Sequence, residues 1–231
     1  ARQAGGKVGS VRLLLLSDIH ADAAALERVL EHARDKEWTQ VVFLGDIVGY
    51  GAQPVEAVDL LRSLPLRVAL EGNHEVMMQM LRRGERVAAT PDIVGRLQEH
   101  LEGLDSGHME FIDSLAPDHA EDDWAAIHGA LRQRFEYLIS VPVARGNAEH
   151  MKRDIYFYGH THVPIAFIEP EGGQWTARAF TGPEGSVSIP EGARAFLNPG
   201  SVSMSRDRLP SNSYGIYDSA SRNFSVYRLP L

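Results

Sequence analysis

Hydrophobic positions in the first third of the chain alternate between two spacings. Residues 11–16, 41–44 and 67–70 are short apolar runs, as expected of strands buried on both faces. Between these runs, apolar residues recur at helical spacing in residues 21–34 and 55–63. The resulting order of strand, helix, strand, helix and strand, at intervals of roughly 27 residues, is typical of parallel βαβ units.

The remainder of the chain changes pattern twice. Residues 76–115 have helical spacing and are rich in Arg, Glu and Met. Beyond residue 123 the pattern predicts strands over 124–127, 155–158, 165–168, 175–180, 193–197, 214–217 and 224–227. Gly/Pro clusters at 170–173 and 182–185 predict hairpin turns. We therefore expect a flexible, Gly-rich tail over residues 1–10 and one α/β domain over 11–231, with a second, more antiparallel sheet.

Composition narrows the function classes. The chain has 231 residues, of which 44% are hydrophobic and 23% charged, and its formal net charge is -8. An acidic surface repels nucleic-acid backbones, so we expect no bulk nucleic-acid binding. The absence of cysteine excludes disulfides, thiolate metal sites and cysteine nucleophiles. No apolar run is long enough to cross a membrane, so we expect no membrane association and a cytoplasmic location.

Polar side chains with metal-ligand chemistry follow the predicted strands directly. They lie in five segments: 17–20, 45–51, 71–75, 128–129 and 159–162. Open α/β sheets place their sites at this edge, beyond the carboxyl ends of the strands. The glycines in these segments allow sharp turns and close backbone approach to a ligand.

These segments offer two carboxylates, one amide oxygen and four imidazoles as donors. This mixture suits Mn, Fe, Zn, Ni or Co and has too much nitrogen for Ca or Mg. Seven donors exceed the needs of one tetrahedral ion but suit two ions that share a carboxylate. Such ions lie about 3.5–4 Å apart and stabilise the attacking and leaving oxygens of a displacement at phosphorus. Their surplus positive charge favours a phosphate ester as substrate.

The motifs together resemble the calcineurin-like metallophosphoesterase superfamily. The residues that carry the resemblance are Asp18-x-His20, Gly45-Asp46-x-x-Gly49, Gly72-Asn73-His74-Glu75, His128-Gly129 and Gly159-His160-Thr161-His162. They occur in the superfamily's order between residue 11 and about residue 165. The segment 198–202, with 213–218 after it, resembles the bacterial phosphodiesterase-like branch. We expect 198–202 to form a turn near the site without a chemical role.

The resemblance implies a fold of four layers, αββα, in which two mixed β-sheets are flanked by helices and the strand carboxyl ends hold a dinuclear metal site. It implies that one metal is bound by Asp18, His20 and His162, the other by Asn73, His128 and His160, and that Asp46 bridges them. The implied cofactors are two divalent transition-metal ions, Mn first, with Fe, Zn, Ni or Co as alternatives. His74 is then a catalytic residue at the leaving oxygen, and a metal-bridging hydroxide attacks phosphorus in line.

Other residues near the motifs carry further expectations. Tyr50, Arg132 and Arg134 are candidate substrate contacts. We interpret the remaining histidines as solvated: His32, His100, His108, His119 and His150.

Ser/Thr protein phosphatases of the superfamily have an Asp-Arg pair where this chain has Gly49-Tyr50. The missing arginine, which binds a phosphomonoester dianion, shifts the expectation toward phosphodiesters. Glu75, however, resembles the protein phosphatases. The expected activity is thus hydrolysis of a small phosphodiester, with nucleotides as candidate substrates. The alternatives are a phosphomonoesterase, a dinucleoside-polyphosphate hydrolase or, more remotely, an inactive scaffold of the same fold. We make no prediction of oligomeric state.

Overall fold

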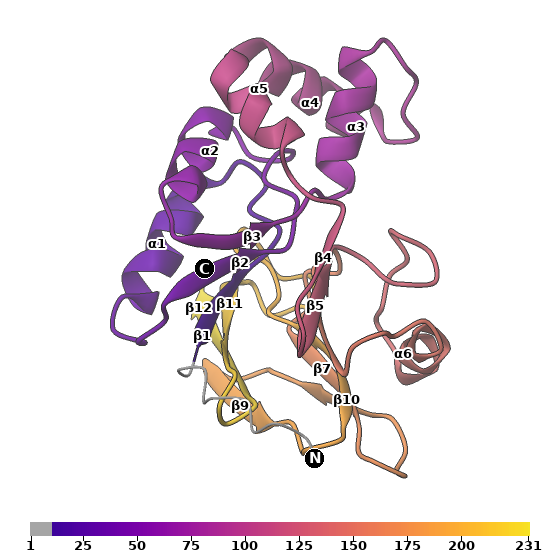
Figure 1. Ribbon diagram of the computed structural model, residues 1–231. Helices are drawn as coiled ribbons and strands as arrows, with labels where there is room; N and C mark the ends of the chain where they lie inside the picture. The colour runs from indigo at the N-terminus through magenta and orange to yellow at the C-terminus, as the bar shows by residue number, and fades with distance from the viewer. Residues whose placement is uncertain (1–10) are drawn as a thin grey trace.

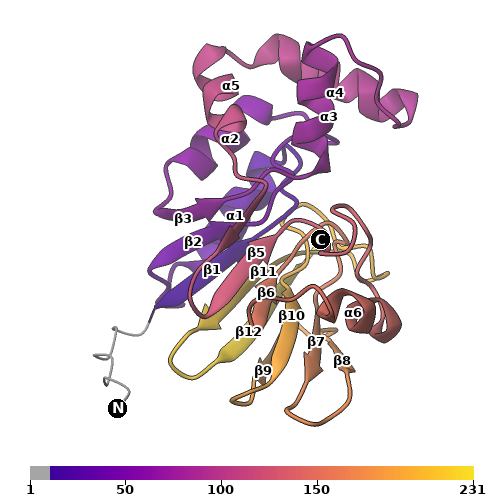
Figure 2. The ribbon, with the colours of Figure 1, turned by 45° about the vertical axis from the view of Figure 1, so that its right-hand side comes forward.

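Two mixed β-sheets of six strands each lie face to face in the computed structural model, which describes residues 11–231 (Figures 1 and 2). The predicted tail over residues 1–10 lies outside the described residues. The first sheet has the strand order β3-β2-β1-β11-β12-β9, and the second has the order β4-β5-β6-β10-β7-β8.

The first sheet joins the predicted parallel strands to an antiparallel part from the end of the chain. Its strands are β1 (Arg12–Leu16), β2 (Gln40–Phe43), β3 (Leu66–Ala69), β9 (Glu184–Ser188), β11 (Ser211–Asp218) and β12 (Asn223–Pro230). β1, β2 and β3 run parallel, as predicted, while β11 pairs antiparallel with both β1 and β12. The chain therefore returns to its first strand after building the second sheet.

The second sheet is mixed as well. Its strands are β4 (Asp118–Ala120), β5 (Trp124–Ile127), β6 (Ile155–Phe157), β7 (Ile165–Glu169), β8 (Thr176–Ala179) and β10 (Arg194–Asn198). β5, β6 and β10 are parallel neighbours, and β7 and β8 form the hairpin that the turn at 170–173 predicts.

Helices cover the outer face of each sheet. They are α1 (Ala23–Ala33), α2 (Pro54–Arg62), α3 (Asn73–Arg82), α4 (Pro91–Gly103), α5 (Ser106–Asp113) and α6 (Val141–Ala148). The helical segment 76–115 is thus divided among three helices. The Asp22 side chain caps α1 by accepting a hydrogen bond of 3.0 Å from the Ala25 N–H. None of the helices in residues 11–231 is long and apolar enough to cross a membrane.

Strand β1 shows how alternation produces the layers. Leu14 and Leu16 pack with residues of the outer helices, whereas Leu13 and Leu15 pack between the two sheets. Successive strand side chains point to opposite faces, so a strand covered on both faces is apolar throughout. A third apolar cluster joins the outer face of the second sheet to α6. The predicted four-layer αββα arrangement is confirmed.

Three details differ from the expectation. The turn predicted at 182–185 is wrong, because β8 belongs to the second sheet and β9 to the first, so the chain crosses between the sheets there. Gly185 lies within β9, whose residues alternate between exposed and half-buried. Strand β4 and helix α6 were not predicted, since β4 has three residues and α6 contains Pro142 and Gly146.

Candidate metal centre

The loops that follow the parallel strands of both sheets converge at one end of the two sheets, on the side of α3 and α4 (Figure 2). β1 leads to Asp18 and His20, β2 to Asp46, and β3 to Asn73 at the start of α3. From the second sheet, β5 and β6 supply the remaining imidazoles: His128, His160 and His162. The structure brings all seven predicted ligand side chains together, in two groups that we call the first and second half-sites.

The first half-site contains Asp18, His20 and His162. The Nε2 atoms of the two histidines are 2.9 Å apart, and Asp18 Oδ1 lies 3.3 Å from His162 Nε2. Each Nδ1 lies 3.0 Å from a backbone carbonyl, that of Val48 for His20 and that of Met204 for His162. An Nδ1–H that donates to a carbonyl leaves the Nε2 lone pair free, so two lone pairs point into the same small space.

The second half-site contains Asn73, His128 and His160. His128 Nε2 lies 3.3 Å from Asn73 Oδ1, and its Nδ1 donates to the Leu44 carbonyl at 2.6 Å. His160 has the opposite arrangement, because its Nε2 donates to the Phe135 carbonyl at 3.0 Å, which leaves Nδ1 as the free nitrogen. Backbone carbonyls therefore set the tautomer of every imidazole in the two half-sites.

Asp46 lies between the two half-sites. Its Oδ2 is 3.8 Å from His20 Nε2 and 3.3 Å from His128 Nε2. Its Oδ1 accepts a hydrogen bond of 2.9 Å from the backbone N–H of His74. One carboxylate oxygen thus faces both groups while the other fixes its orientation.

The donors fit divalent cations. Asp18 Oδ1 is buried and has no hydrogen-bond partner within the described residues, which is costly for a carboxylate unless a cation faces it. Burial lowers the pKa of His20 to about 3 and that of His160 to about 4, so both imidazoles are neutral donors near pH 7. The pKa of Asp46 lies well below its usual value despite burial, because His128 and His74 are close.

His128 behaves differently. Burial works to lower its pKa, but Asp46 and Asp18 outweigh that effect and raise the pKa to about 9. Two buried carboxylates therefore attract positive charge to this centre even without a metal ion. Divalent cations bound by oxygen and nitrogen donors supply that charge.

The backbone around the centre is strained. Five of the seven ligand candidates have a positive φ between 52° and 66°: Asp18, His20, Asp46, His160 and His162. Such conformations cost non-glycine residues about 1–3 kcal/mol each and cluster at functional sites. Glycines permit the close approaches nearby, since a Cβ on Gly72 would lie 2.1 Å from Asp46 Oδ1.

Glu75 supports the loop that carries Asp46. Its buried carboxylate accepts hydrogen bonds from the backbone N–H groups of Asp46 at 2.8 Å, Val48 at 3.1 Å and Gly72 at 2.7 Å. Glu75 has no predicted role in the site from the sequence alone. Its position three residues from Gly72, at the start of α3, is the signal of a capping residue that could have indicated one.

The expectation that His100 and His108 are solvated is wrong. Both are buried, and His100 bonds to the neighbouring loop, where its Nδ1 accepts from the Gly49 N–H at 3.3 Å and its Nε2 donates to the Gly51 carbonyl at 3.0 Å. His100 belongs to α4, so this contact fixes the Asp46 loop from a helix some fifty positions away.

His74 lies beside the first half-site and is itself buried. Its ring centroid is 4.7 Å from that of His20 and 4.9 Å from that of Tyr50. One ring nitrogen lies within 4.8 Å of ligand atoms of His20 and Asp46. Its Nδ1 is buried without a hydrogen-bond partner within the described residues, and burial lowers the pKa of the ring.

The candidate substrate contacts divide between two flanks. Tyr50 is 46% exposed and its ring contacts His20 edge-on, with centroids 4.6 Å apart. On the other flank, Arg134 pairs with Glu71 at 2.7 Å and Arg132 pairs with Glu136. Both guanidiniums on that flank already have a carboxylate partner.

The segment 198–202 has a larger role than a turn. Asn198 Nδ2 donates to the Gly159 carbonyl at 2.9 Å and to Thr161 Oγ1 at 3.1 Å, and so fixes the loop of His160 and His162. Ser201 Oγ donates to the Asp18 carbonyl at 2.9 Å. These buried bonds join the end of β10 to both ligand loops.

Comparison with known proteins agrees with this geometry. The family model for the calcineurin-like phosphoesterase superfamily domain matches residues 11–222. The chain is 28% identical to phosphodiesterase YfcE of Escherichia coli over 84% of this chain and 86% of that protein. It is also 25% identical to an uncharacterized protein of Methanocaldococcus jannaschii, over 94% of this chain and 86% of that protein.

Among solved structures, a metallophosphoesterase from Sphaerobacter thermophilus superposes with a TM-score of 0.82 at 29% identity, over 95% of this chain and 88% of the other. The chain therefore belongs to the calcineurin-like phosphoesterase superfamily. It is a metal-dependent phosphoesterase, a hydrolase that acts on phosphoric esters.

Proposed function

We propose that the protein is a dinuclear-metal phosphodiesterase that hydrolyses small phosphate diesters. The position of Asp46 is the main support, because its Oδ2 faces His20 at 3.8 Å and His128 at 3.3 Å. A single carboxylate oxygen that faces two groups of donors suits a bridge between two ions.

In this proposal Asp18, His20 and His162 hold one ion and Asn73, His128 and His160 hold the other. When bound, the two ions supply an activated water and stabilise negative charge on the phosphoryl oxygens. The chain's residues hold the donors in place, through the carbonyls that fix the imidazole tautomers and through the Glu75 carboxylate behind Asp46.

His74 is proposed to act at the leaving oxygen. Its ring lies beside the first half-site and next to exposed Tyr50, where an ester arm can leave toward solvent. Because burial lowers its pKa, the neutral ring donates a hydrogen bond to the leaving oxygen near pH 7, and a proton if it is charged.

The preference for diesters is supported by the loop beside Asp46. Gly49 and Tyr50 themselves supply no guanidinium to the reacting phosphate, and a diester has one negative charge where a monoester has two. The guanidinium of Arg206 lies at the Tyr50 hydroxyl, so the Tyr50 ring separates it from His20 and His74. A phosphomonoesterase and a dinucleoside-polyphosphate hydrolase are the competing candidates.

Hydrolysis of bis-p-nitrophenyl phosphate and of p-nitrophenyl phosphate by metal-stripped protein tests the proposal, with Mn²⁺ added back. We expect metal-dependent cleavage of the diester and slower cleavage of the monoester. Parallel additions of Fe²⁺, Zn²⁺, Ni²⁺ and Co²⁺ rank the ions. Cleavage of the monoester alone would favour the monoesterase, and failure to cleave either ester while two ions bind would favour the scaffold.

A further inference from the structure

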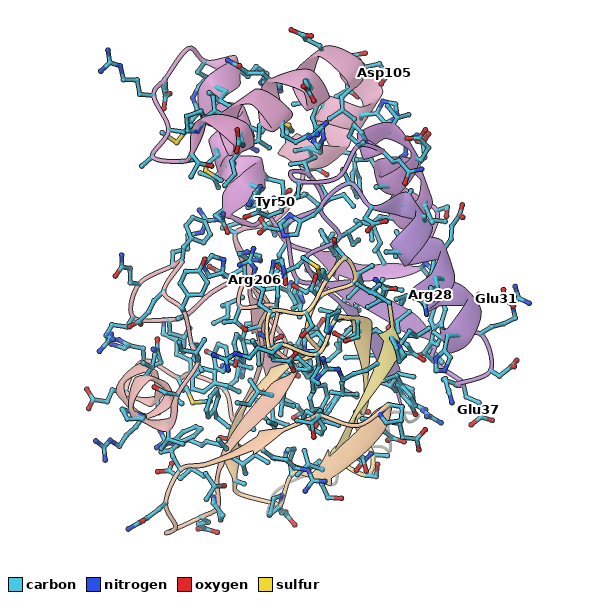
Figure 3. The ribbon with its side chains drawn as sticks, turned by 180° about the vertical axis from the view of Figure 1, so that it is seen from behind. Arg28, Glu31, Glu37, Tyr50, Asp105 and Arg206 are labelled. Carbon is cyan, nitrogen blue, oxygen red and sulfur yellow. The ribbon has the colours of Figure 1, made fainter. Side chains whose placement is uncertain are left out.

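The loop between β10 and β11 also lies beside the first half-site. Arg206 follows β10 in the loop before β11, and its backbone N–H donates to the His162 carbonyl at 3.1 Å. Its Nη2 lies 3.3 Å from the Tyr50 hydroxyl, and its Cζ is 5.8 Å from the centroid of the Tyr50 ring. One aromatic ring therefore separates the guanidinium from His20 and His74. Figure 3 shows Tyr50 and Arg206 as neighbours, with Tyr50 on the side of the helices.

The loop that presents Arg206 is held rigidly. On one side of Arg206, the Ser205 hydroxyl lies 2.6 Å from Asp207 Oδ1. On the other, Asp207 pairs with Arg228 at 2.6 Å, and Arg228 is buried, with 5% of its surface exposed. Arg228 also donates to the carbonyls of Phe180 and Leu209. A loop held in this way loses little conformational entropy when a ligand binds.

The charge of Arg206 is uncompensated. Among residues 11–231 it has no carboxylate within 4.0 Å, because the adjacent Asp207 is taken by Arg228. The chain has a net charge of -8, so an exposed and unpaired guanidinium beside the candidate metal centre is a local positive charge that can bind an anion.

Tyr50 offers a platform next to this charge. It has a φ of 50°, a conformation that glycine would adopt without cost, so its contacts with His20, His74 and Arg206 stabilise a strained residue. Beyond Tyr50 a recess of about 330 Å³ extends toward α4, lined by Thr90, Asp92, Ile93 and Arg96. The recess is large enough for an ester arm of nucleoside size.

We propose that Tyr50 and Arg206 form a subsite for one ester arm of the substrate, in which Arg206 binds a second phosphate that the arm carries. This arm subsite rests on the proposed function and narrows the substrate to nucleotide-like diesters with an additional phosphate near the reacting one. Arg206 is thus a specificity residue that contacts the arm, while the reacting phosphate lies at the half-sites.

The test compares two substrates that share the same diester, TpT and pTpT, of which only pTpT carries the additional phosphate. We expect the wild-type protein loaded with Mn²⁺ to have a kcat/KM for pTpT at least about 10-fold above that for TpT. Arg206→Ala should remove this preference by raising KM for pTpT, with TpT changed less than about 2-fold. Arg206→Lys should retain part of the preference. Arg208→Ala is the matched control, because Arg208 is exposed on the same loop.

A binding measurement that needs no turnover separates the two proposals. Calorimetry on the Mn²⁺-loaded protein compares pTp, with a phosphate at each end of one nucleoside, with Tp, which has a single phosphate. We expect pTp to bind about 10-fold more tightly, and only in proteins that retain Arg206. Equal affinities in the wild type, or equal losses in Arg206→Ala and Arg208→Ala, would overturn the arm subsite even if the diester is hydrolysed. Tighter binding of pTp without hydrolysis of any ester would support the arm subsite and contradict the proposed phosphodiesterase activity.

Discussion

The two half-sites use similar donors but have different surroundings. Beside the first, Tyr50 contacts His20, and the nearby Arg206 has no carboxylate partner within the described residues. Beside the second, Tyr137 stacks on His160 with centroids 4.3 Å apart, and the arginines of that flank are paired with glutamates. The number of arginines near a site therefore does not determine how strongly the site attracts an anion. What determines it is whether each arginine is already paired with a carboxylate.

Replacing Asp46, the proposed bridge between the two half-sites, should have the largest effect because it weakens both half-sites together. Asp46→Asn keeps the shape of the side chain and removes the charge that both sides use. We expect both ions to bind more weakly and turnover to fall at least about 1,000-fold. Metal content after dialysis and hydrolysis of bis-p-nitrophenyl phosphate measure these effects, with exposed Asp35→Asn as the control. Full activity with two bound ions would contradict the assignment of Asp46.

Single ligand changes should separate the half-sites. His20→Ala and His128→Ala each remove a donor from one side only. Each variant should retain about one ion per chain. Turnover should fall more than about 100-fold, because mutating a residue that only supports a metal ligand already lowers activity about 10–100-fold. Elemental analysis reads the occupancy. If either variant lost both ions or neither, the division into two half-sites would be wrong.

His74→Ala should leave both half-sites filled. Because His74 contributes its backbone N–H to Asp46, and alanine keeps that group, metal content should not change. We expect kcat to fall about 100-fold or more, most for esters with poor leaving groups. His119→Ala is a suitable control, because His119 lies on β4 and pairs with Glu121. An equal loss for all leaving groups would indicate that His74 positions the substrate and does not assist the leaving oxygen.

The convergence of the seven candidate ligands at one place could be predicted because each of them lies just beyond the end of a strand. Asp18 follows β1 and Asp46 follows β2 within a few residues, and parallel strands have their carboxyl ends at the same edge of the sheet. The apolar runs predicted the parallel strands and a second, more antiparallel sheet, whereas the four-layer arrangement came from the resemblance to the superfamily. Strand β9 escaped prediction because it is a half-exposed edge strand that starts among turn-forming residues.

The supporting residues could not be predicted for a different reason. His100 contacts Gly49 and Gly51, and Arg206 contacts Tyr50 across 156 positions of sequence, so both depend on how distant elements pack. Arg132 and Arg134 are close to His128 in sequence, and this proximity made them candidates. Sequence distance, however, says nothing about the carboxylates that neutralise them.

The smallest effect is expected on the flank of the second half-site. Arg134 is 43% exposed and pairs with Glu71, an arrangement worth about 0–1 kcal/mol at a surface. Arg134→Ala should therefore change kcat/KM for bis-p-nitrophenyl phosphate and for pTpT less than about 3-fold, with no loss of metal. The same assay on Glu71→Gln, which removes the negative charge beside Arg134 but keeps a hydrogen-bond acceptor, sharpens the comparison between the flanks. If the Glu71 charge is what neutralises Arg134, Glu71→Gln should lower KM for pTpT and TpT alike, and the preference for pTpT, which depends on Arg206, should be unchanged. A loss in Arg134→Ala as large as that in Arg206→Ala would show that the paired arginine binds substrate, and the contrast between the flanks would fail.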